Sequence, residues 1–491
     1  MKRCEYEVIV VGSGFGGLCM GVKLKQAGID AFLILEKDAE FGGTWWANTY
    51  PGCAVDIPSH LYSFSFAQNA AWSRRFAHQG ELLAYTRDVV AQFDLAPHIR
   101  TNTALLGARF DEADGCWTVR TSQGELRTKT LVTSLGGLSR PSIPSLPGIE
   151  NFSGKAFHSS RWDHGIDLRG KRVAVIGTGA SAIQFVPEIA PEVAQLDLYQ
   201  RTPPWILPRP DRIISDTEKW LLARVRPLQW LYRGVDYVVY EAGAIAMVYF
   251  PSLLGAVQRM AKRHLARQVP DPVLRAKLTP DYTFGCKRVL LQNTYYPALM
   301  LPHVSLLTEG IGHVSRDGIV GRDGVERPVD VIIYGTGFDV GHAIGPIDVR
   351  GRGGKSLQDA ARDGLQAYKG CSIAGFPNFF MVTGPNTGTG HNSMIYMIES
   401  AADYVLEAVK TLRVQGLHSV EVNQHAQTAY NALIQRRLKG TVWSTGCKSW
   451  YLDRNGRNGI LWPGFTFAYR RITRRFDIGN YAVRRGDGDV K

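Results

Sequence analysis

The stretch Val8-Ile9-Val10-Val11-Gly12-Ser13-Gly14-Phe15-Gly16-Gly17 decides the fold, and it lies near the start of the chain. Its four apolar residues predict a buried parallel strand, and its glycines predict a tight turn into a helix. Residues 18–27 continue with helical spacing, and a second apolar run, 31–35, ends in Glu36. A strand, a glycine turn, a helix and a strand that closes on an acid are typical of a dinucleotide-binding α/β unit.

Each glycine of this first turn has a physical role. Gly12 allows the tight turn, Gly14 lets the backbone approach a pyrophosphate at the helix N-terminus, and Gly17 lets the helix and strand pack closely. Glu36 would accept hydrogen bonds from ribose hydroxyls, which favours a cofactor without a 2′-phosphate. The alternative is a tight turn in an α/β domain that binds nothing.

A second unit of the same kind follows later in the chain. Residues 172–176 predict a strand, the turn is Gly177-Thr178-Gly179-Ala180-Ser181-Ala182, and residues 195–199 predict the next strand. Ala182 stands where the third glycine is usual, and the pattern allows this replacement. The sequence therefore predicts two dinucleotide sites in one chain.

The two units end in residues of opposite charge. Arg201 stands as far from Gly177 as Glu36 stands from Gly12. An acid suits a free ribose hydroxyl and a base suits a 2′-phosphate, so we expect FAD at the first site and NADPH at the second. Thr202 and Lys287 are further candidates for the phosphate, and a plain surface role for Arg201 is the alternative.

Length and composition bound the architecture. The chain has 491 residues, of which 45% are hydrophobic and 21% charged, enough for two or three domains. We predict an α/β fold with two Rossmann-like dinucleotide-binding domains and a helical insert. The FAD domain would comprise 1–142 and 341–491, the NADPH domain 143–212 and 285–340, and the insert 213–284. A monomer or a small homo-oligomer is expected.

Charge and cysteine usage argue against a nucleic-acid-binding protein and against a disulfide or metal site. The net charge of +13 is spread along the chain without a zinc-finger or basic-helix pattern, so no nucleic-acid partner is expected. The seven cysteines form no C-x-x-C pair, which favours free thiols in a reducing compartment over disulfides or a metal site. The chain enters its first strand almost at once, without room for a signal peptide, so we expect a cytoplasmic protein.

Between the two turns stands the pattern Phe152-x-Gly154-x-x-x-His158-x-x-x-Trp162-Asp163. It resembles the fingerprint of the type I Baeyer–Villiger monooxygenases, class B flavoprotein monooxygenases related to the flavin-containing monooxygenases. The resemblance implies a linker role, in which His158 and Trp162 join the two domains. A histidine alone is more often structural than catalytic, and a general base is the alternative for His158.

A second signature precedes the fingerprint. The segment Gly43-Thr44-Trp45, Tyr50-Pro51-Gly52 and Asp56 is similar to that family's flavin-loop pattern, although Ala54 stands where many relatives have arginine. The resemblance implies that Thr44, Trp45 and Tyr50 contact the flavin and that Asp56 faces its reacting edge. Core packing is the alternative for Trp45.

Two later segments also resemble the family. Arg288 matches its active-site arginine, whose permanent charge would stabilise a peroxyanion and an adduct oxygen, with Asp56 orienting it. A salt-bridging surface arginine is the alternative. Residues 449–452 look like the mobile segment that carries a substrate-side tryptophan, here Trp450, for which packing is the alternative.

The resemblance implies that NADPH and O₂ are consumed while a ketone becomes an ester or lactone through a C4a-peroxyflavin, and it allows sulfide oxidation as a further activity. The first rival is an N- or S-oxygenating flavin monooxygenase that uses a C4a-hydroperoxyflavin. The second rival is a disulfide reductase, which would need a C-x-x-C pair that this sequence lacks. The third is a flavin-bearing interaction protein without enzyme activity.

The apolar stretch 237–254 is interrupted by Glu241 and Pro251, so no stable membrane insertion is expected. We predict a buried helical subdomain that covers the substrate site, rather than a membrane-surface helix. Its length and aromatic content favour bulky or cyclic ketones.

Overall fold

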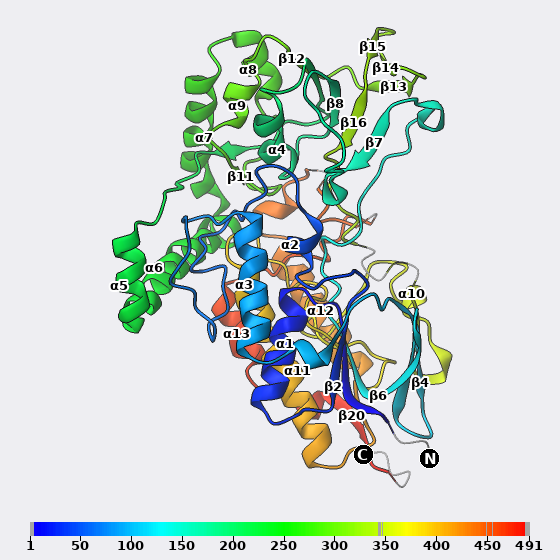
Figure 1. Ribbon diagram of the computed structural model, residues 1–491. Helices are drawn as coiled ribbons and strands as arrows, with labels where there is room; N and C mark the ends of the chain where they lie inside the picture. Colours follow the sequence, from blue (N-terminus) through cyan, green and yellow to red (C-terminus); the bar gives the residue numbers. More distant parts are fainter. Residues whose placement is uncertain (1–3, 342–344, 346, 448, 454, 487–491) are drawn as a thin grey trace.

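The computed structural model describes residues 4–341, 345, 347–447, 449–453 and 455–486. Two separate sheets carry the two glycine turns, and a group of helices projects to one side of them (Figure 1). The chain leaves the first sheet after residue 133 and returns to it at residue 348, so the second unit is inserted between two parts of the first. These domain bounds stay a prediction, and residues 1–3, 342–344, 346, 448, 454 and 487–491 of the first domain lie outside the described residues.

The first sheet has eight strands in the order β17-β4-β5-β6-β1-β2-β3, with β18 paired to β6. The pairs of β1 with β2 and β6 are parallel, whereas β4, β5 and β6 are joined antiparallel. The strands are β1 (Tyr6–Val11), β2 (Phe32–Leu35), β3 (Ile99–Arg100), β4 (Leu105–Asp111), β5 (Cys116–Thr121), β6 (Gly124–Thr133), β17 (Asp348–Arg350) and β18 (Phe379–Met381).

Strand β1 is buried on both faces. Val8 and Val10 contribute to one core together with residues of three helices, α1 (Phe15–Gln26), α3 (Gln79–Gln92) and α11 (Met394–Val414). Ile9 and Val11 contribute to a second core with β4 and β5. A strand that is apolar on both sides reads as a continuous hydrophobic run, which is why the sequence signal at residues 8–11 was clear.

The second sheet is wholly parallel, in the order β12-β9-β8-β16-β7. Its strands are β7 (Lys155–His158), β8 (Arg172–Ile176), β9 (Gln195–Tyr199), β12 (Val304–Leu307) and β16 (Val331–Tyr334). Helices α4 (Ala182–Ile189) and α9 (Tyr295–Ala298) pack together, and a small sheet of β13 (Ile311–Val314), β14 (Gly318–Gly321) and β15 (Glu326–Pro328) contributes to a separate core.

The helical insert comprises α5 (Asp216–Arg224), α6 (Arg226–Ala244), the π-helical turn η4 (Ile245–Tyr249), α7 (Leu254–Gln268) and α8 (Pro272–Leu278). Helices α5 and α6 project away from both sheets (Figure 1). The prediction of a buried helical subdomain is wrong for α6, because its buried residues are Arg233, Asp236, Glu241 and Ala244. Its valines Val238 and Val239 are exposed instead.

The remaining α-helices and strands complete the fold. They are α2 (Thr44–Ala47), β10 (Ile206–Leu207), β11 (Leu290–Leu291), α10 (Leu357–Ala360), β19 (Ser419–Val422), α12 (Gln424–Leu438), α13 (Thr466–Thr473) and β20 (Tyr481–Arg484). Within the described ranges, no single helix is long and apolar enough to cross a membrane. One pair of helical segments, Arg226–Tyr249 and Pro251–Gln268, passes the length and composition test together but is bent by 114°.

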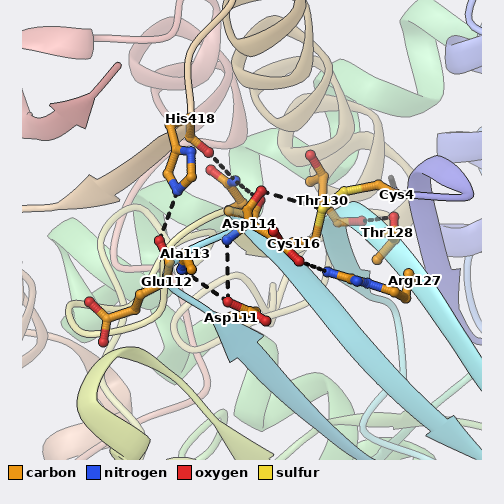
Figure 2. Close-up of a disulfide and its surroundings, with 12 residues drawn as sticks. Cys4, Asp111, Glu112, Ala113, Asp114, Cys116, Arg127, Thr128, Thr130 and His418 are labelled. Atoms are coloured by element: carbon orange, nitrogen blue, oxygen red, sulfur yellow. Dashed lines mark hydrogen bonds and ion pairs between the residues drawn. A yellow bond between two sulfur atoms is a disulfide. The ribbon is translucent and has the colours of Figure 1, made fainter. Parts of the chain in front are cut away.

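Four of the seven cysteines form disulfides, so the expectation that all are free thiols is wrong. Cys4 is bonded to Cys116 beside the ion pair of Arg127 with Asp114 (Figure 2), and Cys286 is bonded to Cys447. The remaining three, Cys19, Cys53 and Cys371, are free and buried. Sequence spacing could not indicate these pairs, because the partners lie 112 and 161 residues apart. No group of three or more potential metal ligands occurs in the described part of the chain.

Candidate active site

The first glycine turn has a backbone that larger residues could not adopt. Gly12 has φ +100°, and a Cβ on it would lie 2.5 Å from the carbonyl oxygen of Ser134. A Cβ on Gly17 would lie 1.8 Å from the carbonyl oxygen of Gly12. Gly14 is the N-cap of α1, so the free amide groups of the helix begin at the turn. This cradle suits a pyrophosphate.

Glu36 lies beside this turn, directly after β2. One of its carboxylate oxygens accepts hydrogen bonds from Ser13 N at 3.0 Å and Ser13 Oγ at 2.5 Å, and the other accepts from Asp38 N at 3.0 Å. The side chain is buried. A carboxylate has about four acceptor positions, so three donors fix its orientation and leave capacity for a ribose hydroxyl.

The flavin-loop residues begin against the same turn. A Cβ on Gly43 would lie 2.7 Å from Gly14 Cα, so the loop and the turn touch through their backbones. Thr44 and Trp45 follow on α2. Trp45 is buried, and its indole Nε1 has no hydrogen-bond partner among the described residues. An unpartnered buried donor beside a dinucleotide cradle is consistent with a polar group that the cofactor would bring.

Tyr50 and Ala54 are tied to the second unit. Tyr50 Oη donates to Gln184 Oε1 at 3.0 Å, and Gln184 Nε2 donates to the Ala54 carbonyl oxygen at 3.0 Å. Gln184 lies on α4, directly behind the second glycine turn. The sequence reasoning did not single it out. It joins the flavin loop to the helix that starts the nucleotide site of the other sheet.

The second turn repeats the geometry of the first. Gly177 has φ +106°, and a Cβ on it would lie 2.5 Å from the carbonyl oxygen of Gly335. Gly179 follows in the turn, and Ala182 begins α4. A Cβ on Gly335 would lie 3.1 Å from the methyl group of Ala182. The methyl that replaces the third glycine is therefore accommodated by a glycine opposite it.

The predicted phosphate cations lie in one region. Arg201 is exposed after β9, and Thr202 accepts a hydrogen bond through its backbone carbonyl from Thr178 Oγ1 at 3.1 Å. Lys287 Nζ lies 4.4 Å from the ring centroid of Tyr282. Burial, together with the positive charge of Arg201, lowers the pKa of Lys287. Because the two cations repel each other, an anion between them would be stabilised.

The fingerprint residues connect the chain segments at the edge of the second sheet. A Cβ on Gly154 would lie 2.3 Å from the Asp330 carbonyl oxygen and 2.6 Å from the Phe152 ring, so only glycine fits. The ring of Trp162 lies 5.3 Å from that of Phe185 on α4. Asp163 Oδ1 accepts from the backbone N–H of Gly165 at 3.0 Å, within its own turn.

His158 is held as a neutral imidazole. Its Nδ1 accepts from the backbone N–H of Ser160 at 3.1 Å, so the proton is on Nε2, which donates to the Gly337 carbonyl oxygen at 3.0 Å. Burial lowers its pKa, although the contact with Gly337 opposes the shift. These contacts link β7 to the chain that returns from β16. They favour the linker role over a general base.

Arg288 and Asp56 form the charged pair at the centre of the site. Arg288 Nε and Nη2 both donate to Asp56 Oδ2, at 2.9 and 2.5 Å. The two side chains keep 35% and 31% of their surface accessible. The negative charge of Asp56 raises the pKa of the guanidinium further above its ordinary value. The active-site role of Arg288 stays a prediction, with a salt-bridging arginine as the alternative.

Two tyrosines missed by the sequence reasoning lie in the field of this pair. Burial raises the pKa of Tyr62 and of Tyr451 to about 12, and the charges of Arg288 and Asp56 act on both. Tyr451 is buried, whereas its neighbour Trp450 is 47% exposed. Their rings lie 4.4 Å apart. The position next to the predicted Trp450 was the only available signal for Tyr451.

Known proteins match almost the whole chain. A Baeyer–Villiger monooxygenase of Pseudomonas aeruginosa is 52% identical over 483 residues, which cover 98% of this chain and 91% of that protein. A Baeyer–Villiger monooxygenase of Streptomyces coelicolor is 46% identical over 480 residues, covering 97% and 92%. The chain belongs to the Baeyer–Villiger monooxygenases. The predicted family is confirmed.

Solved structures of Baeyer–Villiger monooxygenases share the fold. The crystal structure of OTEMO in complex with FAD and NADP has a TM-score of 0.89 at 28% identity and covers 98% of this chain and 100% of the other. A closed structure of cyclohexanone monooxygenase has a TM-score of 0.88 at 27% identity, covering 99% and 100%. Residues 9–227 also match the family described as pyridine nucleotide-disulphide oxidoreductase.

These comparisons confirm the predicted fold class and the two cofactors. This Baeyer–Villiger monooxygenase is an FAD-containing, NADPH-dependent enzyme with two dinucleotide-binding domains and a helical insert. The two glycine cradles and the carboxylate of Glu36 fit such cofactors on the geometry of this chain alone. The roles of individual residues stay predictions.

Proposed function

We propose that this Baeyer–Villiger monooxygenase converts ketones to esters or lactones at a site where Arg288 and Asp56 face the reacting edge of the flavin. The observation that carries the proposal is the double hydrogen bond from Arg288 to one oxygen of Asp56. The pair remains partly accessible instead of being sealed in the core.

The first cradle would hold FAD. Gly12, Gly14 and Gly17 would receive the pyrophosphate, and Glu36 the ribose hydroxyls. Thr44, Trp45 and Tyr50 would contact the isoalloxazine ring. When bound, the reduced flavin supplies the reaction with O₂ and the oxygen that is transferred.

The second cradle would hold NADPH. Gly177, Gly179 and Ala182 would receive its pyrophosphate, and Arg201, Thr202 and Lys287 its 2′-phosphate. The hydrogen bonds of Gln184 to Tyr50 and Ala54 connect this site to the flavin loop. A movement of α4 would therefore be transmitted to the loop that leads to Asp56.

Arg288 would act through a fixed positive charge. Its Nε and Nη2 are held by Asp56, which leaves Nη1 outside this pair. The carboxylate keeps the guanidinium plane in one orientation, so donors need not reorganise when negative charge develops on the oxygen of the ketone. Because its pKa is raised, Arg288 cannot lose its proton to a basic reactant.

Bulky or cyclic ketones are the proposed substrates, with O₂ as the co-substrate and a monomer or small homo-oligomer as the working form. Tyr237 and Tyr240 of the helical insert, which are partly buried against the core, motivate this choice. The predicted cytoplasmic location stays a prediction, and the two disulfides remove part of the argument from free cysteines.

The test is product analysis with ¹⁸O₂ and NADPH on a cyclic ketone and a thioether, assayed side by side. We expect labelled ester or lactone as the main product from the ketone. Labelled sulfoxide without any lactone would favour the rival oxygenation of soft nucleophiles. If a panel of bulky and cyclic ketones gave no product while small linear ketones did, the proposed substrate class would be wrong.

A further inference from the structure

The helical insert turns an apolar face to the outside. Along α6 and η4, five residues stand three, four or seven positions apart and are 41–64% exposed: Leu231, Val235, Val238, Ile245 and Tyr249. This spacing places them on one side of a helix. Further exposed apolar residues of the insert are Trp220, Leu221, Val225, Trp230, Val239, Phe250 and Leu253. Together they form the outer face of the insert.

Polar contacts on the opposite side fix α6 in this orientation. Arg233 Nη1 donates to the carbonyl oxygens of His60, Leu61 and Ser63 at 3.0, 3.2 and 2.7 Å. Asp236 accepts from Arg75 Nη2 at 2.8 Å. The helix is therefore anchored to the body of the protein through buried charged groups.

Glu241 adds a third anchor. Its carboxylate accepts hydrogen bonds from Asn392 Nδ2 at 2.5 Å and from Thr466 Oγ1 at 2.7 Å. To bury the apolar face, α6 would have to rotate and leave Arg233 and Glu241 without partners, which is costly for buried charges. The outward direction of the valines is thus a stable property of the fold.

Basic residues outnumber acids at the surface between the two ends of the insert, although Asp216 and Asp271 are exposed at those ends. From residue 219 to residue 270, the only acids are Asp236 and Glu241, and both are buried. The exposed basic residues of this segment are Arg224, Arg226, Arg259, Lys262, Arg263 and Arg267. Arg224 lies over the ring of exposed Trp220, 4.3 Å from its centroid. The stretch from residue 219 to residue 270 therefore exposes apolar and basic side chains, the apolar ones mainly on α6 and η4 and four of the six cations on α7.

The exposed apolar and basic side chains distinguish between two possible binding partners of the outer face, a second copy of the chain and a lipid surface. Two copies that met through residues 219–270 would bring their exposed cations together, with no exposed acid in that stretch to offset them. An anionic lipid surface offers negative headgroups and an apolar layer beneath them, and exposed tryptophans suit the boundary between the two. We propose that the outer face of the insert docks this enzyme on the surface of an anionic lipid bilayer, with α6 lying along the boundary. This proposal does not depend on the substrate or the catalytic roles given above.

Vesicle flotation of the FAD-loaded enzyme tests the proposal. Vesicles of phosphatidylcholine alone are compared with vesicles that contain about one third phosphatidylglycerol. We expect the enzyme to float with the anionic vesicles and much less with the neutral ones. Binding should weaken at high salt, because the Debye length falls from about 10 Å at 0.1 M to about 3 Å at 1 M.

Substitutions separate the contributions of apolar and of charged residues to vesicle binding. The double variant Leu231→Glu/Val238→Glu should lose at least about tenfold of its binding to anionic vesicles, and Arg259→Glu/Arg263→Glu should lose a similar amount. The matched control is Val414→Glu, because Val414 is 83% exposed at the end of α11, outside the insert. It should float like the wild type. Flavin absorbance and NADPH oxidation without lipid check that each variant is folded.

Three results would overturn the proposal. The wild-type enzyme could fail to float with either vesicle, or Leu231→Glu/Val238→Glu could float as well as the wild type. The third is a stable wild-type dimer in sedimentation that Val238→Glu converts to a monomer, which would assign the outer face to a second copy of the chain.

Discussion

The disulfide between Cys286 and Cys447 joins the segment that carries Arg288 to the segment that carries Trp450 and Tyr451. Cys286 stands two positions before the arginine that pairs with Asp56. Tyr451, four positions after Cys447, lies in the field of that same pair. One covalent bond therefore holds both sides of the proposed ketone site.

Removing this disulfide should affect ketone use as well as stability. In Cys286→Ser/Cys447→Ser we expect a severalfold higher KM for the ketone, because the segment of Tyr451 can move away from Arg288, while flavin reduction by NADPH stays unchanged. The matched control is Cys4→Ser/Cys116→Ser, remote from this pair. Each variant should lose roughly 2–5 kcal/mol of unfolding free energy in urea. Equal ketone KM values in both variants would show that the bond does not shape the site.

Arg288→Ala should separate the two half-reactions. The variant keeps both nucleotide cradles, so we expect stopped-flow reduction of the flavin by NADPH within about threefold of the wild type. Ester formation should fall by at least about a hundredfold, because a preorganised charge is lost. Arg288→Lys keeps the positive charge but lacks the forked guanidinium, so its rate of ester formation should lie between those of the wild type and Arg288→Ala. Ester yield retained in Arg288→Ala would exclude the proposed role.

Arg201→Ala should change the choice of nicotinamide cofactor. Loss of a charged contact to the 2′-phosphate should raise the KM for NADPH about ten- to a hundredfold, because a charge-assisted hydrogen bond contributes about 1.5–3 kcal/mol. The KM for NADH should change by less than about twofold. Arg169→Ala, which removes an exposed arginine paired with Asp167, is the control and should change neither KM. Equal increases for NADPH and NADH would refute the phosphate assignment.

The sequence predicted those parts of the site whose constraints are local. Gly12, Gly17 and Gly177 stand where the backbone leaves no room for a Cβ, and each was recognised from its neighbours in the chain. Glu36 was likewise found from its place at the end of β2. In each case a few consecutive residues determine the geometry, so a short pattern is sufficient.

Contacts between distant segments could not be predicted in this way. Gln184 meets Tyr50 and Ala54 from positions more than a hundred residues away, and no spacing indicates that contact. The periodicity of α6 showed that it has two faces but not which of them is buried. Apolar faces are usually buried, and here Arg233 and Glu241 find partners in other segments that reverse the preference.

His60 should make the enzyme less stable in mild acid. Burial lowers its pKa to about 4 from the ordinary value of 6.5, and neither ring nitrogen has a hydrogen-bond partner among the described residues. As the pH falls below 6.5 the unfolded chain binds a proton that the folded chain does not, so the free energy of unfolding decreases down to about pH 4. The total loss from this one group is about 3 kcal/mol.

Urea unfolding at several pH values measures the effect. His60→Met should make the decrease between pH 6.5 and 4 smaller by about 3 kcal/mol, because the ring is replaced by an uncharged side chain while the backbone carbonyl that accepts from Arg233 remains. The control is His425→Met, which removes an exposed histidine of α12 and should follow the wild-type pH dependence. If His60→Met loses stability in acid as steeply as the wild type, the acid sensitivity arises from other groups and the buried imidazole is not its cause.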